Sequence, residues 1–400
     1  MKTTVAPDVK ADFPVANRTI GGSPLVYLDS AATSLKPQSV IDAIVHYYSA
    51  VGANIHRGKH MLSEIASVHY EKTRVKIARF IGCAAAEVTF VQNTTHALNV
   101  VAHGLSLDSS DLVVIQGDSH HSAMLPWRQY ARVEHFRVTP QGIPDLDHFE
   151  ALLRKRPRVV VLTHCSNITG LYAPVVEMTR LAKDAGALVV VDGAQSIPHR
   201  PFRFRESGID FLAFSAHKML GPTGVGVLCG RIDLLRELRP MCHGGGMVDW
   251  VEYDVERVRE LPHGLEAGTP DIAAVYGFGA AIDYLEALGW DFITAHDRRL
   301  ATLLYAEAAR RDGLTLVSGD GAADRSAILG LSIAGSSMSA IATALSDSHS
   351  IMCRSGHMCC QPFVHACFGG EVMRASAYVY TSEEEVMQFF DALDEVRAYL

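Results

Sequence analysis

The sequence lacks the features of membrane, exported and nucleic-acid-binding proteins. No apolar run reaches the roughly 20 residues of a membrane-spanning helix, and residues 1–8 lack the apolar core of a signal peptide. Lysine and arginine together number 36 against 44 acidic residues, the formal net charge is −8, and no basic tract occurs. This charge balance argues against a nucleic-acid partner. We therefore expect a cytoplasmic protein that binds neither membrane nor nucleic acid.

Cysteine is sparse and lacks the spacing of a disulfide or zinc framework. The eight cysteines include no C-x-x-C pair, and without a signal peptide we expect them to be reduced rather than bridged. The C-terminal part holds one alternative, a zinc site made from His357, Cys359, Cys360 and His365. The spacing of these four residues is poor for zinc, and we expect no metal.

What is present indicates a globular α/β chain with more than one domain. The 400 residues are 48% hydrophobic and 20% charged, which is typical of globular proteins but long for a single core. Strands and helices alternate through residue 230, a pattern that predicts a mainly parallel sheet with helices on both faces. We expect an N-terminal arm at 1–22, a large domain at 23–275 and a smaller α+β domain at 276–400.

Apolar runs and helical periodicity predict the individual elements. The expected strands lie at 25–29, 87–91, 111–115, 159–163, 187–192, 210–215, 327–333 and 372–378. The expected helices lie at 63–80, 175–185, 272–288, 291–311 and 337–346. A last helix begins at a capping box formed by Ser382 and Glu385.

Polar side chains follow several of the strands predicted for the large domain. Ligands of parallel sheets gather outside the carboxyl ends of the strands. The polar residues expected at that edge are Thr94, His120, Asn167, Asp192, Ser215 and Lys218. Their convergence predicts one ligand site.

The pair Asp192 and Lys218 indicates the chemistry of this site. Each residue ends or follows a strand-like apolar run, where a charged side chain is unfavourable unless its charge is used or removed. Pyridoxal 5′-phosphate (PLP) needs a lysine for its Schiff base and an acidic partner for its ring nitrogen. The alternative is an ion pair at the edge of the sheet.

Other residues near this edge also allow two interpretations. Thr94 and Thr95 should open a helix whose N-terminus binds a phosphate, or they form a plain N-cap. His120 either stacks on an aromatic cofactor or is a surface group.

The segment around Cys359 predicts a constrained loop, since Gly356 and Pro362 bracket it. Nearby cations would lower the thiol pKa and make it reactive. The alternative is an inert, packed cysteine doublet with Cys360. Downstream, Arg374 either binds a carboxylate, as arginine forks do, or forms a surface ion pair.

In this order the motifs resemble those of the class V aminotransferases, PLP-dependent enzymes of fold type I, and within them the Suf-type (group II) cysteine desulfurases and selenocysteine lyases. The resemblance runs from about Tyr27 to the C-terminus. It is carried by Leu28-Asp-Ser-Ala-Ala32, His56-Arg57-Gly58, Thr94-Thr95, His120-His121, Ser166-Asn167, Asp192-Gly-Ala-Gln195, Ser215-Ala-His217-Lys218, Gly244-Gly-Gly-Met247, Glu266-Ala-Gly-Thr-Pro270 and Arg354-Ser-Gly-His-Met-Cys359.

The resemblance implies a role for each matching residue. Lys218 would carry the cofactor, Asp192 would pair with its ring nitrogen, and His120 would stack on the ring. Gln195 would bond the ring's phenolic oxygen. The residues implied for the cofactor phosphate are Thr95, Ser215 and His217, with Thr269 reaching the phosphate of the other subunit of a homodimer, and Thr94 is expected as a further cofactor-binding residue. The residues implied for the substrate are His56, Asn167, Arg354 and Arg374.

The implied reaction is the conversion of L-cysteine to L-alanine, with the sulfur left as a persulfide on Cys359. A second protein or a small thiol would accept the sulfur, for iron–sulfur cluster assembly, thio-cofactor synthesis or another pathway. Three positions depart from the family pattern: Gly264 replaces an arginine, Met358 replaces a histidine, and Cys360 replaces a small residue.

Two rival functions remain. Another class V enzyme, whether a selenocysteine lyase, an epimerase or an aminotransferase, would keep Lys218 and Asp192 without using Cys359. A non-catalytic scaffold would bind no cofactor.

Overall fold

The computed structural model describes residues 9–317 and 324–399. Residues 1–8, on which the expectation about a signal peptide rests, lie outside the described residues. The large sheet has seven strands in the order β4 (Val88–Val91), β10 (Gly226–Gly230), β9 (Phe211–Ser215), β8 (Leu188–Asp192), β7 (Val159–Thr163), β5 (Leu112–Gln116) and β6 (Arg132–Phe136).

This sheet is mainly parallel, which confirms the predicted α/β fold class. Strands β6, β5, β7, β8 and β9 are parallel neighbours, whereas β10 runs antiparallel to both β9 and β4. The pattern of alternation did not predict the antiparallel strand β10, which returns directly after β9 without a crossover helix.

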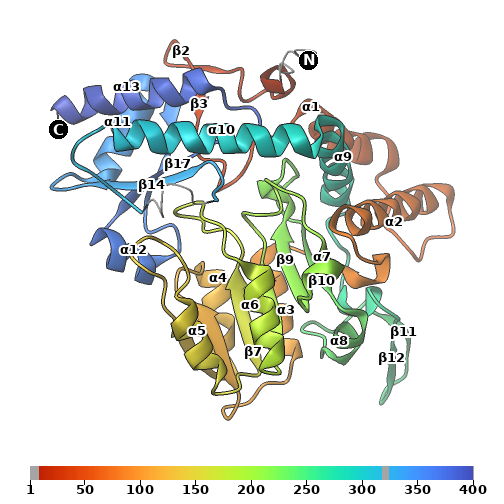
Figure 1. The fold of residues 1–400 in the computed structure, drawn as a ribbon. Helices are drawn as coiled ribbons and strands as arrows, with labels where there is room; N and C mark the ends of the chain where they lie inside the picture. Colours follow the sequence, from red (N-terminus) through yellow and green to blue (C-terminus); the bar gives the residue numbers. More distant parts are fainter. Residues whose placement is uncertain (1–8, 318–323, 400) are drawn as a thin grey trace.

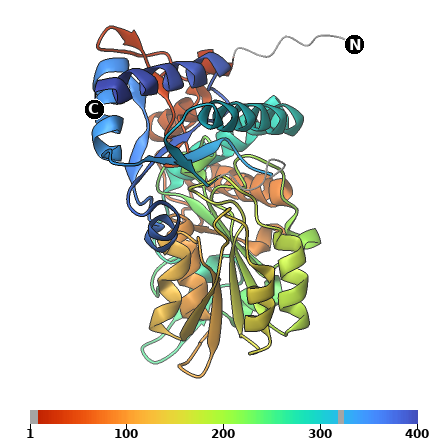
Figure 2. The same cartoon turned by 60° about the vertical axis from the view of Figure 1, so that its left-hand side comes forward.

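Helices cover both faces of the sheet, as Figure 2 shows. Alternate residues of one strand face different cores: Val113 and Ile115 pack in the cluster that includes α3 (Thr94–Gly104), and Leu112 and Val114 pack in the cluster that includes α5 (Leu146–Leu153) and α6 (Val175–Asp184). Burial on both faces explains why the strands are continuous apolar runs rather than alternating ones.

A second, antiparallel sheet is built from the C-terminal part of the chain. Its order is β13 (Leu314–Leu316), β14 (Ile328–Ile333), β17 (Val372–Ser376) and β16 (Arg354–Gly356). The helices α10 (Trp290–Ala309), α11 (Met338–His349) and α13 (Glu383–Tyr399) lie with this sheet in the upper part of Figure 1. They share its core.

The start of the described chain also packs against this C-terminal part. The short strand β3 (Val26–Tyr27) pairs in parallel with β15 (Ile351–Met352), and Val26 and Leu28 belong to the same core as β14 and β17. The domain limits expected above stay a prediction.

Several elements match their predicted bounds. Helix α9 spans Ile272–Leu288 as expected, and α2 (Met61–Ile81) ends at Gly82, whose φ of 73° is the left-handed conformation typical of a helix C-cap. The capping box of α13 is formed: Ser382 N donates to Glu385 Oε2 at 2.8 Å, and Glu385 N donates to Ser382 Oγ at 3.2 Å.

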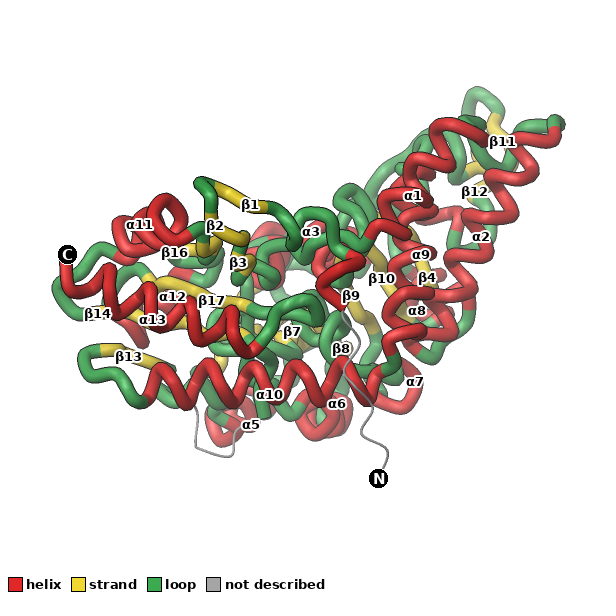
Figure 3. Tube along the Cα trace, turned by 90° about the horizontal axis from the view of Figure 1, so that it is seen from above, coloured by secondary structure: helices red, strands yellow, loops and turns green. Residues whose placement is uncertain are grey.

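One end of the molecule in Figure 3 carries α1 (Gln38–His46), α2 and the hairpin of β11 (Val248–Val251) and β12 (Glu256–Val258), and the opposite end carries α11, α12 and α13. Helix α12 spans Gln361–Phe368.

Among the described residues no single helix has the length and apolar composition to cross a membrane. The consecutive helices α9 and α10, which are bent by 82° relative to each other, meet the length and composition criteria only when they are taken together. The remaining short elements are β1 (Thr19–Ile20), β2 (Ser23–Pro24), α4 (His121–Met124), α7 (Phe204–Ser207), α8 (Ile232–Glu237), η1 (Val9–Asp12), η2 (Tyr47–Val51), η3 (Ala85–Glu87), η4 (Pro126–Gln129), η5 (Ala216–Lys218) and η6 (His263–Leu265).

Candidate active site

A cavity of about 380 Å³ lies where the carboxyl ends of the central strands meet the second sheet. Its volume falls in the range of about 300–1,000 Å³ that is usual for small-molecule sites. All but two of the fourteen residues predicted for the site line this cavity. Those that line it are Thr94, Thr95, His120, Asn167, Asp192, Gln195, Ser215, His217, Lys218, Arg354, Cys359 and Arg374.

Lys218 and Asp192 are a lysine and a carboxylate that line the same cavity. Lys218 ends the short turn η5 after β9, and Asp192 ends β8. Burial lowers the pKa of Lys218 to about 8, against the opposing attraction of Asp192. Burial also raises the pKa of Asp192, whose Oδ1 accepts a hydrogen bond from Ala194 N at 2.9 Å. An amine with a pKa near neutrality is a usable nucleophile and base.

His120 is a neutral imidazole with a defined tautomer. Burial, together with the positive charge of Lys218, lowers its pKa to about 4. Its Nδ1 accepts a hydrogen bond from Ser122 N at 3.1 Å, so the ring proton is on Nε2. Gln195 is oriented in turn by a hydrogen bond from Nε2 to the carbonyl of Ala31, at 2.7 Å.

Hydroxyl groups gather at the N-terminus of α3, at one side of the cavity. Thr94 Oγ1 lies 2.7 Å from Ser215 Oγ, and Thr95 Oγ1 lies 2.7 Å from Ser122 Oγ. The helix is capped by Asn93, whose side chain accepts from His96 N at 2.9 Å. Neither threonine is therefore needed as the N-cap, and both are available to an anion at the helix N-terminus.

Two arginines from neighbouring strands form the opposite side. Arg354 of β16 and Arg374 of β17 are cross-strand partners. Arg374 is only 3% exposed, so the alternative of a surface ion pair is wrong. Its Nη1 donates to Asn167 O at 3.1 Å, while within the described residues its Nε and Asn167 Oδ1 are buried without a hydrogen-bond partner. Buried polar atoms are rarely left unsatisfied, and these two are placed to bind a ligand.

Asp29 lies in the motif Leu28-Asp-Ser-Ala-Ala32 but had no predicted role, and it binds both arginines. Its carboxylate accepts from Arg354 Nε at 3.0 Å and Nη2 at 2.7 Å, and from Arg374 Nη2 at 3.3 Å. Asp29 lies two residues after the end of β3, and the same signal of a carboxylate after an apolar run would have identified it.

The loop that carries Cys359 is constrained, as predicted, and hydrogen bonds hold it at the cavity. Met358 and Cys359 both have positive φ angles, 49° and 55°, which are rare for non-glycine residues. Asn167 Nδ2 donates to Met358 O at 2.9 Å, and His121 N donates to Cys359 O at 2.7 Å. The Cys359 side chain is thereby held at the cavity and is exposed.

The adjacent thiol of Cys360 has a different environment. It is fully buried, its Sγ donates to Asp118 O at 3.1 Å, and burial raises its pKa well above the usual value. All eight cysteines are free, as predicted. Among the described residues, the cluster of His357, Cys359, Cys360 and His365 does not bring three ligand atoms within reach of one ion.

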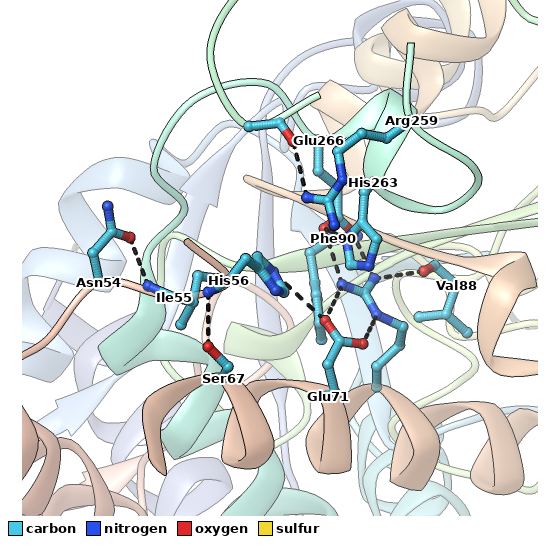
Figure 4. A network of polar contacts seen from close by, with 12 residues as sticks. Asn54, Ile55, His56, Ser67, Glu71, Val88, Phe90, Arg259, His263 and Glu266 are labelled. Atoms are coloured by element: carbon cyan, nitrogen blue, oxygen red, sulfur yellow. Dashed lines mark hydrogen bonds and ion pairs between the residues drawn. The ribbon is translucent and has the colours of Figure 1, made fainter. Parts of the chain in front are cut away.

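The two predicted residues outside the cavity, His56 and Thr269, line a separate pocket of about 290 Å³. Figure 4 shows the polar network on its wall. The fully buried Arg74 binds Glu266 through Nη1 at 2.6 Å and Glu71 through Nε at 2.9 Å. His56 Nε2 lies 3.7 Å from Glu71 Oε1.

Glu71, His56 and His263 are the one group in the described part of the chain whose side chains could jointly reach a metal ion. Arg74 already donates to both carboxylate oxygens of Glu71. We therefore interpret the group as part of an internal ion-pair network.

The structure explains one departure from the family pattern. A Cβ atom at Gly264 would lie 2.5 Å from the carbonyl oxygen of Arg259, a distance that no side chain tolerates. The close approach of η6 to the end of β12 therefore requires glycine at this position.

Comparison with known proteins assigns the class to which this fold and site belong. Residues 26–389 match the model of the family described as aminotransferase class V, and the chain belongs to this family. Among curated relatives, a cysteine desulfurase of Haloferax volcanii is 38% identical, covering 97% of this chain and 96% of its own. A probable cysteine desulfurase of Halalkalibacterium halodurans is 38% identical over 98% of both chains.

Solved structures agree with this assignment. The cysteine desulfurase of Thermococcus onnurineus superimposes with a TM-score of 0.93 at 34% identity over the whole of both chains. A cysteine desulfurase of Escherichia coli superimposes with a TM-score of 0.87 at 33% identity over 98% of both. The fold is therefore that of the fold type I enzymes, and within the class V family the chain groups with the cysteine desulfurases. Its assignment to the Suf-type subgroup stays a prediction.

Proposed function

We propose that the protein is a PLP-dependent cysteine desulfurase that converts L-cysteine to L-alanine and retains the sulfur as a persulfide on Cys359. One observation carries the proposal: a single cavity holds a lysine of lowered pKa, a buried aspartate, an unpartnered arginine Nε and an exposed thiol. Each of the four has a separate task in this reaction, and no simpler binding function needs all of them.

The residues of the cavity fit PLP. The proposed ligands are Lys218 for the aldehyde, Asp192 for the ring nitrogen, His120 for the ring face and Gln195 for the phenolic oxygen, with Thr94, Thr95, Ser215 and His217 for the phosphate. The hydroxyls at the N-terminus of α3 support a phosphate. When bound, the cofactor supplies an electron sink that makes the substrate α-carbon acidic.

Arg374 and Asn167 orient the substrate. The free Nε of Arg374 binds the substrate carboxylate. The resemblance assigns Asn167 to the same carboxylate, but its Nδ2 is engaged with Met358 O and its free Oδ1 is an acceptor, so we assign Asn167 to the substrate amino group. Lys218, with a pKa of about 8, is the base that takes the α-proton.

Cys359 then accepts the sulfur. Its thiolate attacks the substrate sulfur, an S–S bond forms, and the C–S bond breaks with its electron pair passing to the substrate carbon. That carbon is protonated, alanine leaves, and the enzyme is left with a persulfide. The loop positions this sulfur at the mouth of the cavity, where an acceptor protein or a small thiol has access.

The proposal extends to a homodimer in which the pocket of His56 and Thr269 faces the cavity of the second subunit. Thr269 then contacts the cofactor phosphate of the other subunit, as the resemblance implies, and we extend the same arrangement to the predicted contact of His56 with the substrate. Delivery of sulfur to iron–sulfur cluster assembly rests on the resemblance alone, and a cytoplasmic location stays the expectation drawn from the sequence.

The test is turnover of L-cysteine by the purified, cofactor-loaded protein in the presence of a reducing thiol. We expect alanine and sulfide in equal amounts. Pyruvate or a keto acid in place of alanine would assign the chain to another class V reaction, and the absence of both cofactor and turnover would favour a scaffold.

Replacing Arg374 with lysine is expected to weaken substrate binding selectively. Lysine keeps the positive charge but lacks the planar guanidinium group that pairs with a carboxylate through two donors. A hydrogen bond to a charged group is worth about 1.5–3 kcal/mol, which corresponds to roughly 10–100-fold in KM. Steady-state kinetics with L-cysteine measure the effect. The matched control is Arg354→Lys, because Arg354 is half exposed and mainly engaged with Asp29, so its KM effect should be smaller. Equal effects would contradict the assignment.

The lowered pKa of Lys218 predicts an unusual pH dependence of cofactor capture. Below the pKa the amine is protonated and unreactive, and above it the amine is neutral. For the cofactor-free protein, the rate at which added PLP develops its visible absorption band should rise with pH and level off above a midpoint near pH 8. A rate that keeps rising to about pH 10, the range of an ordinary lysine, would contradict the burial of this amine.

A further inference from the structure

The segment Thr33–Lys36, which precedes α1, lies against the turn that carries Lys218. Four donors from this segment converge on one acceptor, the carbonyl oxygen of His217. They are Ser34 N at 2.9 Å, Ser34 Oγ at 3.1 Å, Thr33 Oγ1 at 3.0 Å and Lys36 Nζ at 3.0 Å.

This concentration of donors acts on the peptide bond that joins His217 to Lys218. A carbonyl oxygen has two lone pairs, so four donors within hydrogen-bond distance exceed the usual number and restrict the position of this oxygen. The peptide unit is planar and includes the Cα atom of Lys218. Holding its carbonyl oxygen in place therefore restricts the orientation of the peptide plane and the direction in which the Lys218 side chain leaves the backbone.

The same segment holds the backbone beyond Lys218. Leu220 N donates to Ser34 Oγ at 2.8 Å, and Leu220 has a φ of 66°. A bulky residue in this region is strained and persists only where its surroundings hold it. Ser34 therefore contacts the backbone on both sides of Lys218.

Lys36 makes these contacts without a counter-ion. Its Nζ donates to the carbonyls of His217 and Ser34 and to Thr33 Oγ1, and in the described part of the chain no carboxylate forms an ion pair with it. Burial lowers its pKa to about 7. A partly buried ammonium that binds only neutral oxygens is unfavourable for stability, and Lys36 does not line the cavity itself. Its contacts instead end at the backbone of the cofactor-binding turn.

We infer that Lys36 and Ser34, assisted by Thr33, are positioning residues that fix the His217–Lys218 peptide and so aim the Lys218 amine into the cavity. The inference rests on the proposed function, because it concerns capture of the cofactor aldehyde. It predicts that removing the Lys36 amine slows the reaction of Lys218 even when Lys218 is neutral.

The experiment uses the full chain stripped of cofactor and measures how fast its visible band develops after PLP is added. Rates are recorded across about pH 7–10 and compared at their plateaus, where the amines of Lys218 and Lys36 are both deprotonated; a neutral Lys36 amine still donates hydrogen bonds. Lys36→Met removes the donor but keeps the side-chain length, and its plateau rate is expected to fall about 10–100-fold, the range for a small misplacement of a reacting group. Lys36→Gln keeps a donor and should recover most of the rate. Thr33→Val also leaves three donors on the carbonyl but keeps the Lys36 amine among them, so its plateau rate should fall less than that of Lys36→Met.

A purely structural role would lower the thermal unfolding temperature and leave the plateau rate of the folded protein unchanged. A Lys36→Met plateau within twofold of the wild type overturns the inference while the proposed function stands. Absence of the band in the wild type overturns the proposed function, and the inference with it. If Lys36→Met does not fold, Ser34→Ala, which loses the contacts to His217 O and Leu220 N, is judged by the same twofold criterion.

Discussion

Replacing Lys218 with alanine is expected to abolish desulfuration and to remove the covalent attachment of the cofactor. Loss of a positioned general base alone lowers kcat by about 10²–10⁴-fold, and loss of the attachment point adds to this. Lys218 lines the cavity and has a pKa lowered to about 8 by burial, so no other described group of the cavity replaces its neutral amine. Alanine production from L-cysteine and the visible absorption of the cofactor are the two measurements.

The control for this variant is Lys155→Ala. Lys155 is a half-exposed surface lysine that pairs with Glu134 at 2.6 Å, and exposed ion pairs contribute little to stability, about 0–1 kcal/mol. Its activity and absorption should equal those of the wild type. A Lys218→Ala protein that keeps alanine production within tenfold of the wild type would contradict the role of this lysine.

The second large effect is expected for Cys359→Ser. Serine keeps the size of the side chain, but its hydroxyl is not ionised near neutral pH and cannot accept sulfur to form a persulfide. Alanine formation from L-cysteine should fall at least about 100-fold, as for other groups that act in the transition state. The cofactor absorption should be unchanged, since the contacts assigned to the cofactor come from other residues.

Cys360→Ser is the matched control because it changes the same atom one residue along. The Cys360 thiol is buried and donates to Asp118 O, a hydrogen bond that a serine hydroxyl can also donate, so turnover should remain within a few-fold of the wild type. The reverse outcome, with Cys360→Ser inactive and Cys359→Ser active, would transfer the nucleophile to Cys360. Native activity in both variants would favour an enzyme that does not use a thiol.

The central part of the site was predictable because it depends on strand ends. Asp192 and Lys218 follow apolar runs, and the carboxyl ends of parallel strands meet at one edge, so sequence order alone places them together. The same reasoning found Thr94, His120 and Asn167, all of which line the cavity. Arg374 was identified by its position on a predicted strand, but its burial required the three-dimensional packing of β17 against the cavity.

Other features depend on contacts that sequence separation hides. Asp29 meets Arg354 across 325 positions of the chain, and no local pattern indicates such a pairing. Cys359 and Cys360 are neighbours with opposite environments, because the left-handed backbone at Met358 and Cys359 turns the loop. His56 and Thr269 line a separate pocket and not the cavity; the resemblance implies a contact of Thr269 with another subunit, and one chain does not define the position of a second.

The most direct test of the central claim is mass spectrometry of the intact and digested protein after brief turnover of L-cysteine without a reducing thiol. The account predicts that the chain gains one sulfur atom and that the peptide containing Cys359 carries it, with the Lys218→Ala protein gaining none. Sulfur on a different cysteine, or alanine formed with no sulfur retained by the wild type, would contradict it.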